Sequence, residues 1–187
     1  MIENVEEIFV KTGAVLKGHF LLTSGLHSPV YWEKFKILQH PEYTERLCRM
    51  IADHYSDYHV QVVAGPTTGG IILAYEVARQ LGVRSIYAEK DGSERIFRRS
   101  LSISPGERVL VVEDILTTGG SVEQVLAAVC KLSGNVVGVG ILVDRSEKKL
   151  EFGVPLFSCL RSQTIAYQPN VCPLCSAGIP LVKPGGS

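Results

Sequence analysis

From residue 41 onward the chain alternates short, largely apolar runs with amphipathic segments, and this alternation predicts its architecture. The apolar runs, which we interpret as strands, are 61–65, 85–89, 108–114 and 136–144. The segments between them repeat apolar residues at helical spacing and predict helices at 41–55, 69–82 and 121–134. Buried strands that alternate with helices indicate an α/β fold, in which helices flank a central, mostly parallel sheet.

The N-terminal residues depart from this pattern and predict a small hood region. Asn4 is a favourable N-cap and Gly13 a favourable stop, so a first helix is expected between them. Two short extended segments follow at 19–22 and 30–35, and the turn-rich sequence TSGLHSP joins them. We therefore divide the chain into three parts, a hood at 1–40, a core at 41–160 and a C-terminal extension at 161–187.

Length and composition favour a single domain over 1–187 that binds a small molecule. The 187 residues carry 19 basic and 19 acidic side chains, and 45% are hydrophobic, which argues against disorder and against a broad surface for nucleic acid. No apolar run approaches the roughly 20 residues of a membrane span, and the first residues lack the pattern of a cleaved signal. We expect a cytoplasmic protein with neither a membrane nor a nucleic-acid partner.

The five cysteines do not form the pattern of a disulfide framework. Cys48 and Cys130 fall in helical apolar patterns, where a buried small side chain is the simplest interpretation. The sequence CPLC at 172–175 has three open interpretations: half of a zinc site, a redox pair, or a tight turn with two thiols. Because we find no second cysteine pair that would complete a tetrahedral site, we assign no metal ligand.

Three motifs fall where predicted parallel strands end. They are AGPTTGG, EDILTTGGS and VDR, and right-handed crossovers would bring all three to the same edge of the sheet. In the second motif, the backbone N–H groups of Thr117 to Gly120 would be free at a helix N-terminus, which favours an anion. Glu113 and Asp114 precede this turn and would repel a phosphate unless they face sugar hydroxyls or a divalent metal. The motif therefore favours a sugar phosphate, although the two acids could also simply cap neighbouring turns.

An apolar strand followed by two acids and TTGGS resembles the phosphoribosyl pyrophosphate signature of the type I phosphoribosyltransferases. The segments TSGLHSPVYW, GPTTGGI and VDR narrow the resemblance to the orotate phosphoribosyltransferases, over about residues 3–160. The resemblance implies that orotate and phosphoribosyl pyrophosphate are converted to orotidine 5'-monophosphate and pyrophosphate, with Mg²⁺, in de novo UMP biosynthesis. It also implies a homodimer with shared active sites.

The resemblance assigns roles to residues that match the family's motifs. The 5'-phosphate would be held by the turn and its hydroxyls, which are Thr117, Thr118, Gly119, Gly120 and Ser121. Glu113 and Asp114 would hold the ribose hydroxyls, and Asp114 is one of two expected catalytic residues. Orotate would contact Arg145, Thr117, Tyr31 and Trp32. From the residues alone, Arg145 could instead form a surface salt bridge with Asp144 or Glu147, and the two aromatic residues could belong to the core.

The sequence departs from the family at the pyrophosphate end. Thr23 and Gly69 stand where lysines are usual, and the usual mobile loop is shortened to AEKDGSERIFRRSL. We interpret Lys90 as the relocated catalytic cation, supported by Arg95 and Arg98. The alternative is that this segment is a solvated hairpin.

Two rival functions stay open. A purine-base phosphoribosyltransferase would share the phosphate cradle, but TSGLHSP and Arg145 argue against it. A regulator that kept the fold without catalysis would explain the missing lysines, but the zero net charge argues against a regulator that binds nucleic acid.

Overall fold

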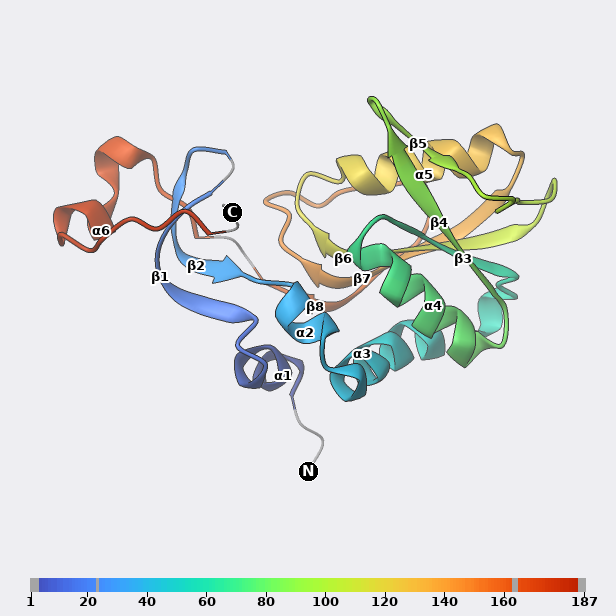
Figure 1. Ribbon diagram of the computed structural model, residues 1–187, viewed down its shortest axis with the longest axis horizontal. Helices are drawn as coiled ribbons and strands as arrows, with labels where there is room; N and C mark the ends of the chain where they lie inside the picture. Colours follow the sequence, from blue (N-terminus) through green and yellow to red (C-terminus); the bar gives the residue numbers. More distant parts are fainter. Residues whose placement is uncertain (1–3, 23, 163–164, 185–187) are drawn as a thin grey trace.

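The computed structural model describes residues 4–22, 24–162 and 165–184, and it consists of an α/β core with a hood at one end (Figure 1). Six strands form the central sheet, in the spatial order β5 (Glu94–Phe97), β4 (Arg84–Asp91), β3 (Val62–Pro66), β6 (Arg108–Leu116), β7 (Asn135–Asp144) and β8 (Leu156–Arg161). Every neighbouring pair is parallel except β4 and β5. The predicted α/β fold with a mostly parallel sheet and a hood is confirmed.

Helices cover both faces of the sheet. One face packs against α3 (Pro41–His54) and α4 (Gly69–Leu81), with the short α2 (Phe35–Leu38) beside them, and the other face packs against α5 (Gly120–Lys131). Alternate residues of β6 enter the two cores, as Leu110 and Val111 illustrate with no exposed surface on either. This double burial explains why the strands read as continuous apolar runs. Across the described residues, no helix combines the length and apolar character that crossing a membrane would require.

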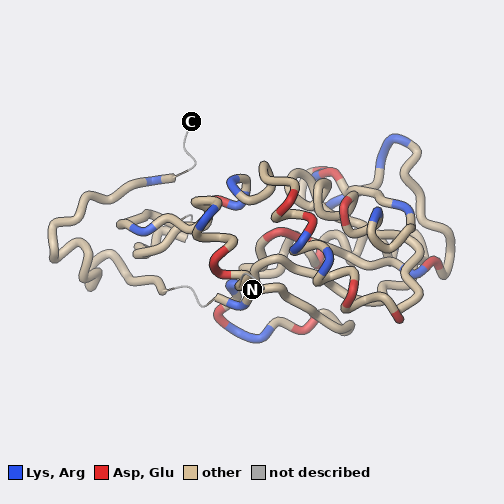
Figure 2. Tube along the Cα trace, turned by 90° about the horizontal axis from the view of Figure 1, so that it is seen from below, with Lys and Arg blue, Asp and Glu red and all other residues tan. Residues whose placement is uncertain are grey.

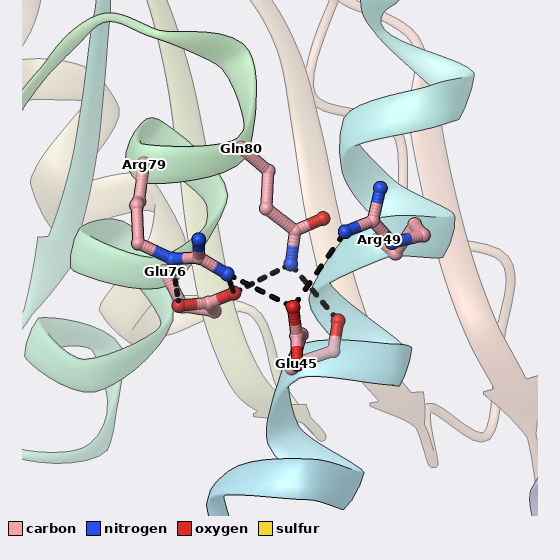
Figure 3. Close-up of polar contacts among 5 residues, drawn as sticks. All are labelled: Glu45, Arg49, Glu76, Arg79 and Gln80. Carbon is pink, nitrogen blue, oxygen red and sulfur yellow. Dashed lines mark hydrogen bonds and ion pairs between the residues drawn. The ribbon is translucent and has the colours of Figure 1, made fainter.

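A polar network on the surface joins α3 to α4 (Figure 3). Arg79 donates to Glu76 at 2.7 Å and to Glu45 at 3.0 Å, and Gln80 donates to the backbone carbonyl of Glu45 at 2.9 Å. The hydrogen bond from Arg79 is the main cause that lowers the pKa of Glu76. Because Arg79 and Glu45 are each about half exposed, this network orients the helices but contributes little to stability.

The hood is a two-stranded antiparallel sheet, β1 (Val15–Leu21) and β2 (His27–Trp32), preceded by α1 (Val5–Lys11). The C-terminal extension packs on this hood (Figure 1). Its residue Val182 exchanges two backbone hydrogen bonds with β1, and Tyr167 exchanges two with His27 on β2. The extension contains a short 3₁₀ turn (Pro169–Val171) and α6 (Pro173–Ser176). Segments from the two ends of the sequence therefore form one lobe.

The structure extends the predicted elements in three places. The strand expected at 85–89 continues to Asp91 and turns through Gly92, at φ +59°, into β5, so this segment is a paired hairpin rather than a loop. The strand β8 was not predicted and crosses the boundary at 160. In the hood, β1 begins at Val15 and β2 begins inside the predicted turn, while Thr23 lies outside the described residues.

Candidate active site

The turn after β6 has the conformation expected of an anion cradle. Thr117 and Thr118 are exposed at its tip, and Gly119 is the N-cap of α5 at φ +87°, a backbone conformation that favours glycine. A Cβ at Gly119 would also press on Leu150 at 3.1 Å and on Phe152 at 3.3 Å. The N-cap side of α5 has no side-chain cap, so the helix N-terminus is open to an anion.

Asp114 lies buried beside this turn, with 2% of its surface exposed. Its Oδ1 accepts from the backbone N–H of Ile115 at 2.7 Å and from Nζ of Lys34 at 3.1 Å. Nζ of Lys34 also lies 3.0 Å from Oδ2, and the lysine side chain is 38% exposed. Lys34 follows β2, so the hood contributes a cation to a carboxylate at the sheet edge. Sequence reasoning missed Lys34.

Glu113 is also buried, and its carboxylate is held within the cradle. Oε2 accepts from the hydroxyl of Ser121 at 2.7 Å, and Oε1 accepts from the backbone N–H of Asp114 at 3.0 Å. Burial, together with the adjacent charge of Asp114, raises the pKa of Glu113 to about 7. The side chain of Ser121, which we expected on the phosphate, therefore positions Glu113 in this structure.

The raised pKa of Glu113 predicts a specific dependence of stability on pH. Between about pH 4.5 and 7 the folded state keeps this proton and the unfolded state releases it, so the free energy of unfolding falls as pH rises. Replacing Glu113 by glutamine removes this dependence. Relative to the variant, the wild type should lose on the order of 3 kcal/mol across that interval, as measured by urea unfolding at fixed pH steps.

The matched control for this prediction is Glu123→Gln, which neutralises an exposed acid in the first turn of α5. That variant should follow the wild-type pH profile, because it leaves the buried acids Glu113 and Asp114 unchanged. A constant offset between Glu113→Gln and wild type at every pH would contradict the buried, protonated state of Glu113. Glu113→Gln also changes the hydrogen bond with Ser121, which can shift its free energy of unfolding equally at every pH. The test is therefore how the difference from wild type changes with pH.

The turn after β3 places Gly69 against Asp114. A Cβ at Gly69 would overlap Oδ2 of Asp114, so this structure has no room for the family's lysine there. Arg95 reaches the same turn from β5, and its Nη1 donates to Oγ1 of Thr67 at 3.1 Å and to the carbonyl of Ala88 at 3.2 Å. Within the described chain, the buried Nε of Arg95 has no hydrogen-bond partner. A cation thus stands beside the turn, supplied by another strand.

The other arginines of the β4–β5 hairpin pair with acids of β4. Arg98 pairs with Asp91 at 3.0 Å, and Arg99 pairs with Glu89 at 2.9 Å. Lys90 lies opposite Arg95 in the strand register and is exposed. Of the three cations expected at the pyrophosphate end, the structure therefore brings Arg95 to the turn, while Lys90 and Arg98 lie on the hairpin itself.

Arg145, which follows β7, lies close to the aromatic pair of the hood. The guanidinium of Arg145 lies 5.9 Å from the ring centre of Trp32. Burial lowers the pKa of Arg145 from its ordinary value. Trp32 also packs against the core and meets Phe9 edge to face at 5.2 Å, so it has a structural role as well.

Asp144, one of the two acids considered as a partner of Arg145, contacts other residues. Oδ1 of Asp144 accepts from the backbone and the hydroxyl of Ser146, at 2.9 and 2.6 Å, and Oδ2 lies 3.9 Å from Arg161. Asp144 therefore orders the turn that follows β7. Arg145 belongs to the half-buried group with Tyr31 and Trp32, which provides a cation and aromatic surface for a planar anion.

Comparisons with known proteins agree with this arrangement. Residues 35–174 match the family described as "Phosphoribosyl transferase domain". A curated orotate phosphoribosyltransferase of Desulforamulus reducens is 52% identical over 98% of this chain and 96% of its own length. One from Caldanaerobacter subterraneus is 54% identical with the same coverage. The crystal structure of orotate phosphoribosyltransferase from Aeropyrum pernix superposes with a TM-score of 0.73 at 26% identity, covering 84% of this chain and 93% of that one.

Proposed function

The chain belongs to the phosphoribosyltransferase family, and we propose that it transfers the phosphoribosyl group of phosphoribosyl pyrophosphate to orotate. The products are orotidine 5'-monophosphate and pyrophosphate, in the biosynthesis of UMP. The observation that carries the proposal is the similarity to curated orotate phosphoribosyltransferases across 98% of the chain, hood and extension included. The local geometry supports it, since an anion cradle, two buried acids and an aromatic–arginine group share one sheet edge.

Each part of the site has a separate task in this proposal. The turn Thr117–Ser121 binds the 5'-phosphate through its N–H groups and the hydroxyls of Thr117 and Thr118, and Glu113 and Asp114 hold the ribose hydroxyls. Arg145 and Thr117 bind polar groups of orotate, and Tyr31 and Trp32 wall the ring. No covalent nucleophile is required, because bond cleavage at C1 builds oxocarbenium character that positioning and exclusion of water can support.

Cations stabilise the charge on the departing pyrophosphate. Arg95 stands at the turn of Thr67, and we assign Lys90 and Arg98 to the same task from the hairpin. Mg²⁺ would neutralise charge on the diphosphate when bound. The donors fit such an ion, because Asp114 and Glu113 offer hard carboxylate oxygens and a magnesium ion takes its remaining ligands from substrate and water. A homodimer with shared sites and a cytoplasmic location are also part of this proposal.

The proposal is tested by supplying phosphoribosyl pyrophosphate and Mg²⁺ with one base at a time. Orotate should be consumed and pyrophosphate released in equal amounts, while adenine, guanine and hypoxanthine give no product above background. Turnover with a purine would instead support a purine-base enzyme. Binding of phosphoribosyl pyrophosphate by calorimetry without turnover of any base would support a regulator that kept the fold.

Arg145 provides a prediction about base recognition. Replacing Arg145 by alanine removes a charge-assisted contact to orotate, which costs about 1.5–3 kcal/mol, and should raise the KM for orotate by roughly 10- to 150-fold. The KM for phosphoribosyl pyrophosphate should change far less, because its phosphate is bound at the cradle. Steady-state kinetics with each substrate varied in turn measures both constants. Equal increases in the two KM values would mean that Arg145 has a structural role.

A further inference from the structure

Two histidines and two cysteines converge in the hood, far apart in the sequence and outside the active site. They are His19 and His27 of the hairpin and Cys172 and Cys175 of the sequence CPLC. One ligand atom from each residue lies within 4.8 Å of the other three. Three of the four residues are buried, and Cys175 is exposed. Figure 1 places α6, which carries Cys175, at the outer end of the hood, away from the strand ends that form the cradle.

Four of the six separations between these ligand atoms lie close to those expected around one tetrahedral ion. Nε2 of His19 lies 3.0 Å from Nδ1 of His27, 3.6 Å from Sγ of Cys172 and 3.8 Å from Sγ of Cys175. Sγ of Cys175 lies 3.3 Å from Nδ1 of His27. With zinc–nitrogen and zinc–sulfur bonds of about 2.0–2.1 and 2.3 Å, a regular tetrahedron spaces its ligand atoms by about 3.3–3.8 Å.

The hydrogen bonds of His19 leave the correct nitrogen available for a metal. Nδ1 of His19 lies 2.7 Å from the carbonyl oxygen of Ile179, which can only accept. The ring proton of neutral His19 is therefore on Nδ1, and Nε2 presents its lone pair to His27 and the two sulfurs. A metal-binding histidine that donates its other N–H to a backbone carbonyl is the usual arrangement in proteins, because it fixes the tautomer and the ring orientation.

The lobe that contains this cluster has little else to hold it together. Among the described residues from 165 to 184, Cys172 is the only buried one, while Val171 is 68% and Ile165 53% exposed. An isolated two-stranded sheet is marginal in water, and small units without a core need a disulfide or a metal. The extension is also almost uncharged (Figure 2), with Lys183 the single charged residue from 162 to 187. It therefore offers no carboxylate for Mg²⁺ or Ca²⁺.

We propose that His19, His27, Cys172 and Cys175 bind one structural Zn²⁺ that fastens the C-terminal extension to the hood. Two thiolates and two imidazoles in tetrahedral array select zinc among the common cellular ions, and a full set of four protein ligands is typical of a structural site. The CPLC sequence supplies half of the site, and the hairpin supplies the other half. The ion is distinct from the Mg²⁺ of the proposed reaction in ligand type and in position.

The first test measures metal in the untagged full-length protein, purified without chelator. Elemental analysis should give about one zinc per chain. Cys172→Ser and His27→Gln should each reduce zinc retention by about tenfold or more. Cys130→Ser is the matched control, since Cys130 lies on α5 outside the cluster and its loss should leave zinc unchanged. Full zinc in both cluster variants would overturn the proposal.

The second test uses the wild-type chain, so it does not depend on the folding of a variant. After zinc is removed under reducing conditions, Co²⁺ should restore the intense visible bands of tetrahedral cobalt together with sulfur-to-cobalt charge transfer. Amide exchange in 165–184 should rise by about tenfold or more on metal removal, while the strands β3, β6 and β7 stay protected. Absence of zinc with no cobalt spectrum, or a Cys172–Cys175 disulfide in metal-free protein from fresh cells, would overturn the proposal.

Discussion

Replacing Arg95 by alanine is expected to lower kcat for phosphoribosyl transfer by about 10²-fold or more, with a smaller change in either KM. Its guanidinium lies at the turn of Thr67, where Gly69 replaces the usual lysine and cannot be enlarged because Asp114 fills the space. Negative charge develops on the departing pyrophosphate only as the bond to C1 breaks. A donor placed at that position stabilises the transition state more than the ground state.

The matched control is Arg99→Ala on the same hairpin. Arg99 is 72% exposed and pairs with Glu89, so its removal should change kcat by no more than about twofold. This control tests whether the loss of any positive charge from the hairpin lowers kcat. Arg95→Lys separates charge from geometry, because lysine keeps the charge but loses the planar guanidinium whose Nη1 donates to both Thr67 and Ala88. Equal losses in Arg95→Ala and Arg99→Ala, or a loss confined to KM, would contradict the assigned role of Arg95.

The core was predictable because its information is local. Each buried strand reads as an apolar run, and each helix between strands repeats its apolar face, so the order of elements fixes a parallel sheet and the edge at which the ends of β3, β6 and β7 meet. The cradle followed from the same logic, since Gly119 and the open N-terminus of α5 are encoded within a few residues. These features do not depend on a distant partner.

Peripheral strands were harder to predict because burial does not shape their sequences. β5 is a short, partly exposed strand whose partner β4 carries Glu89, Lys90 and Asp91 on its outer half, so neither shows continuous apolar character there. β8 is an edge strand with intermediate burial along most of its length. Such segments gain order mainly by pairing with a strand already in place, which a local pattern does not reveal.

Contacts between distant parts of the chain were not predictable from spacing. Lys34 meets Asp114 across 80 residues, and His19 meets Cys172 across 153. For Lys34 the only signal was a cation just after the aromatic pair of the hood. For CPLC, we looked only for a second pair of cysteines and so did not consider histidines as ligands. His19 and His27 both lie in the short segment that precedes the core. A search for histidine as well as cysteine ligands would have found them.

The proposed homodimer with shared active sites leads to the second prediction. If Lys90 serves the site of a neighbouring subunit, Lys90→Ala and Asp114→Asn homodimers should each retain less than about a hundredth of wild-type kcat, since each loses a residue from every site. Mixing the two should restore activity to about a quarter of wild type, because random pairing makes half of the dimers mixed and each mixed dimer has one intact site. Activity is measured after subunit exchange, which native mass spectrometry follows independently.

The control pairs Asp114→Asn with Thr118→Val, two residues at the end of β6 and in the turn that follows it in one chain. Because both belong to the same site, every site in their mixed dimers keeps one defect, and mixing should restore nothing. Recovery in this control would show that exchange or refolding, rather than complementation, produces the activity. Complete exchange without recovery for Lys90→Ala and Asp114→Asn would contradict a shared site. Near-normal turnover of Lys90→Ala by itself would remove Lys90 from catalysis and leave Arg95 as the relocated cation at the turn.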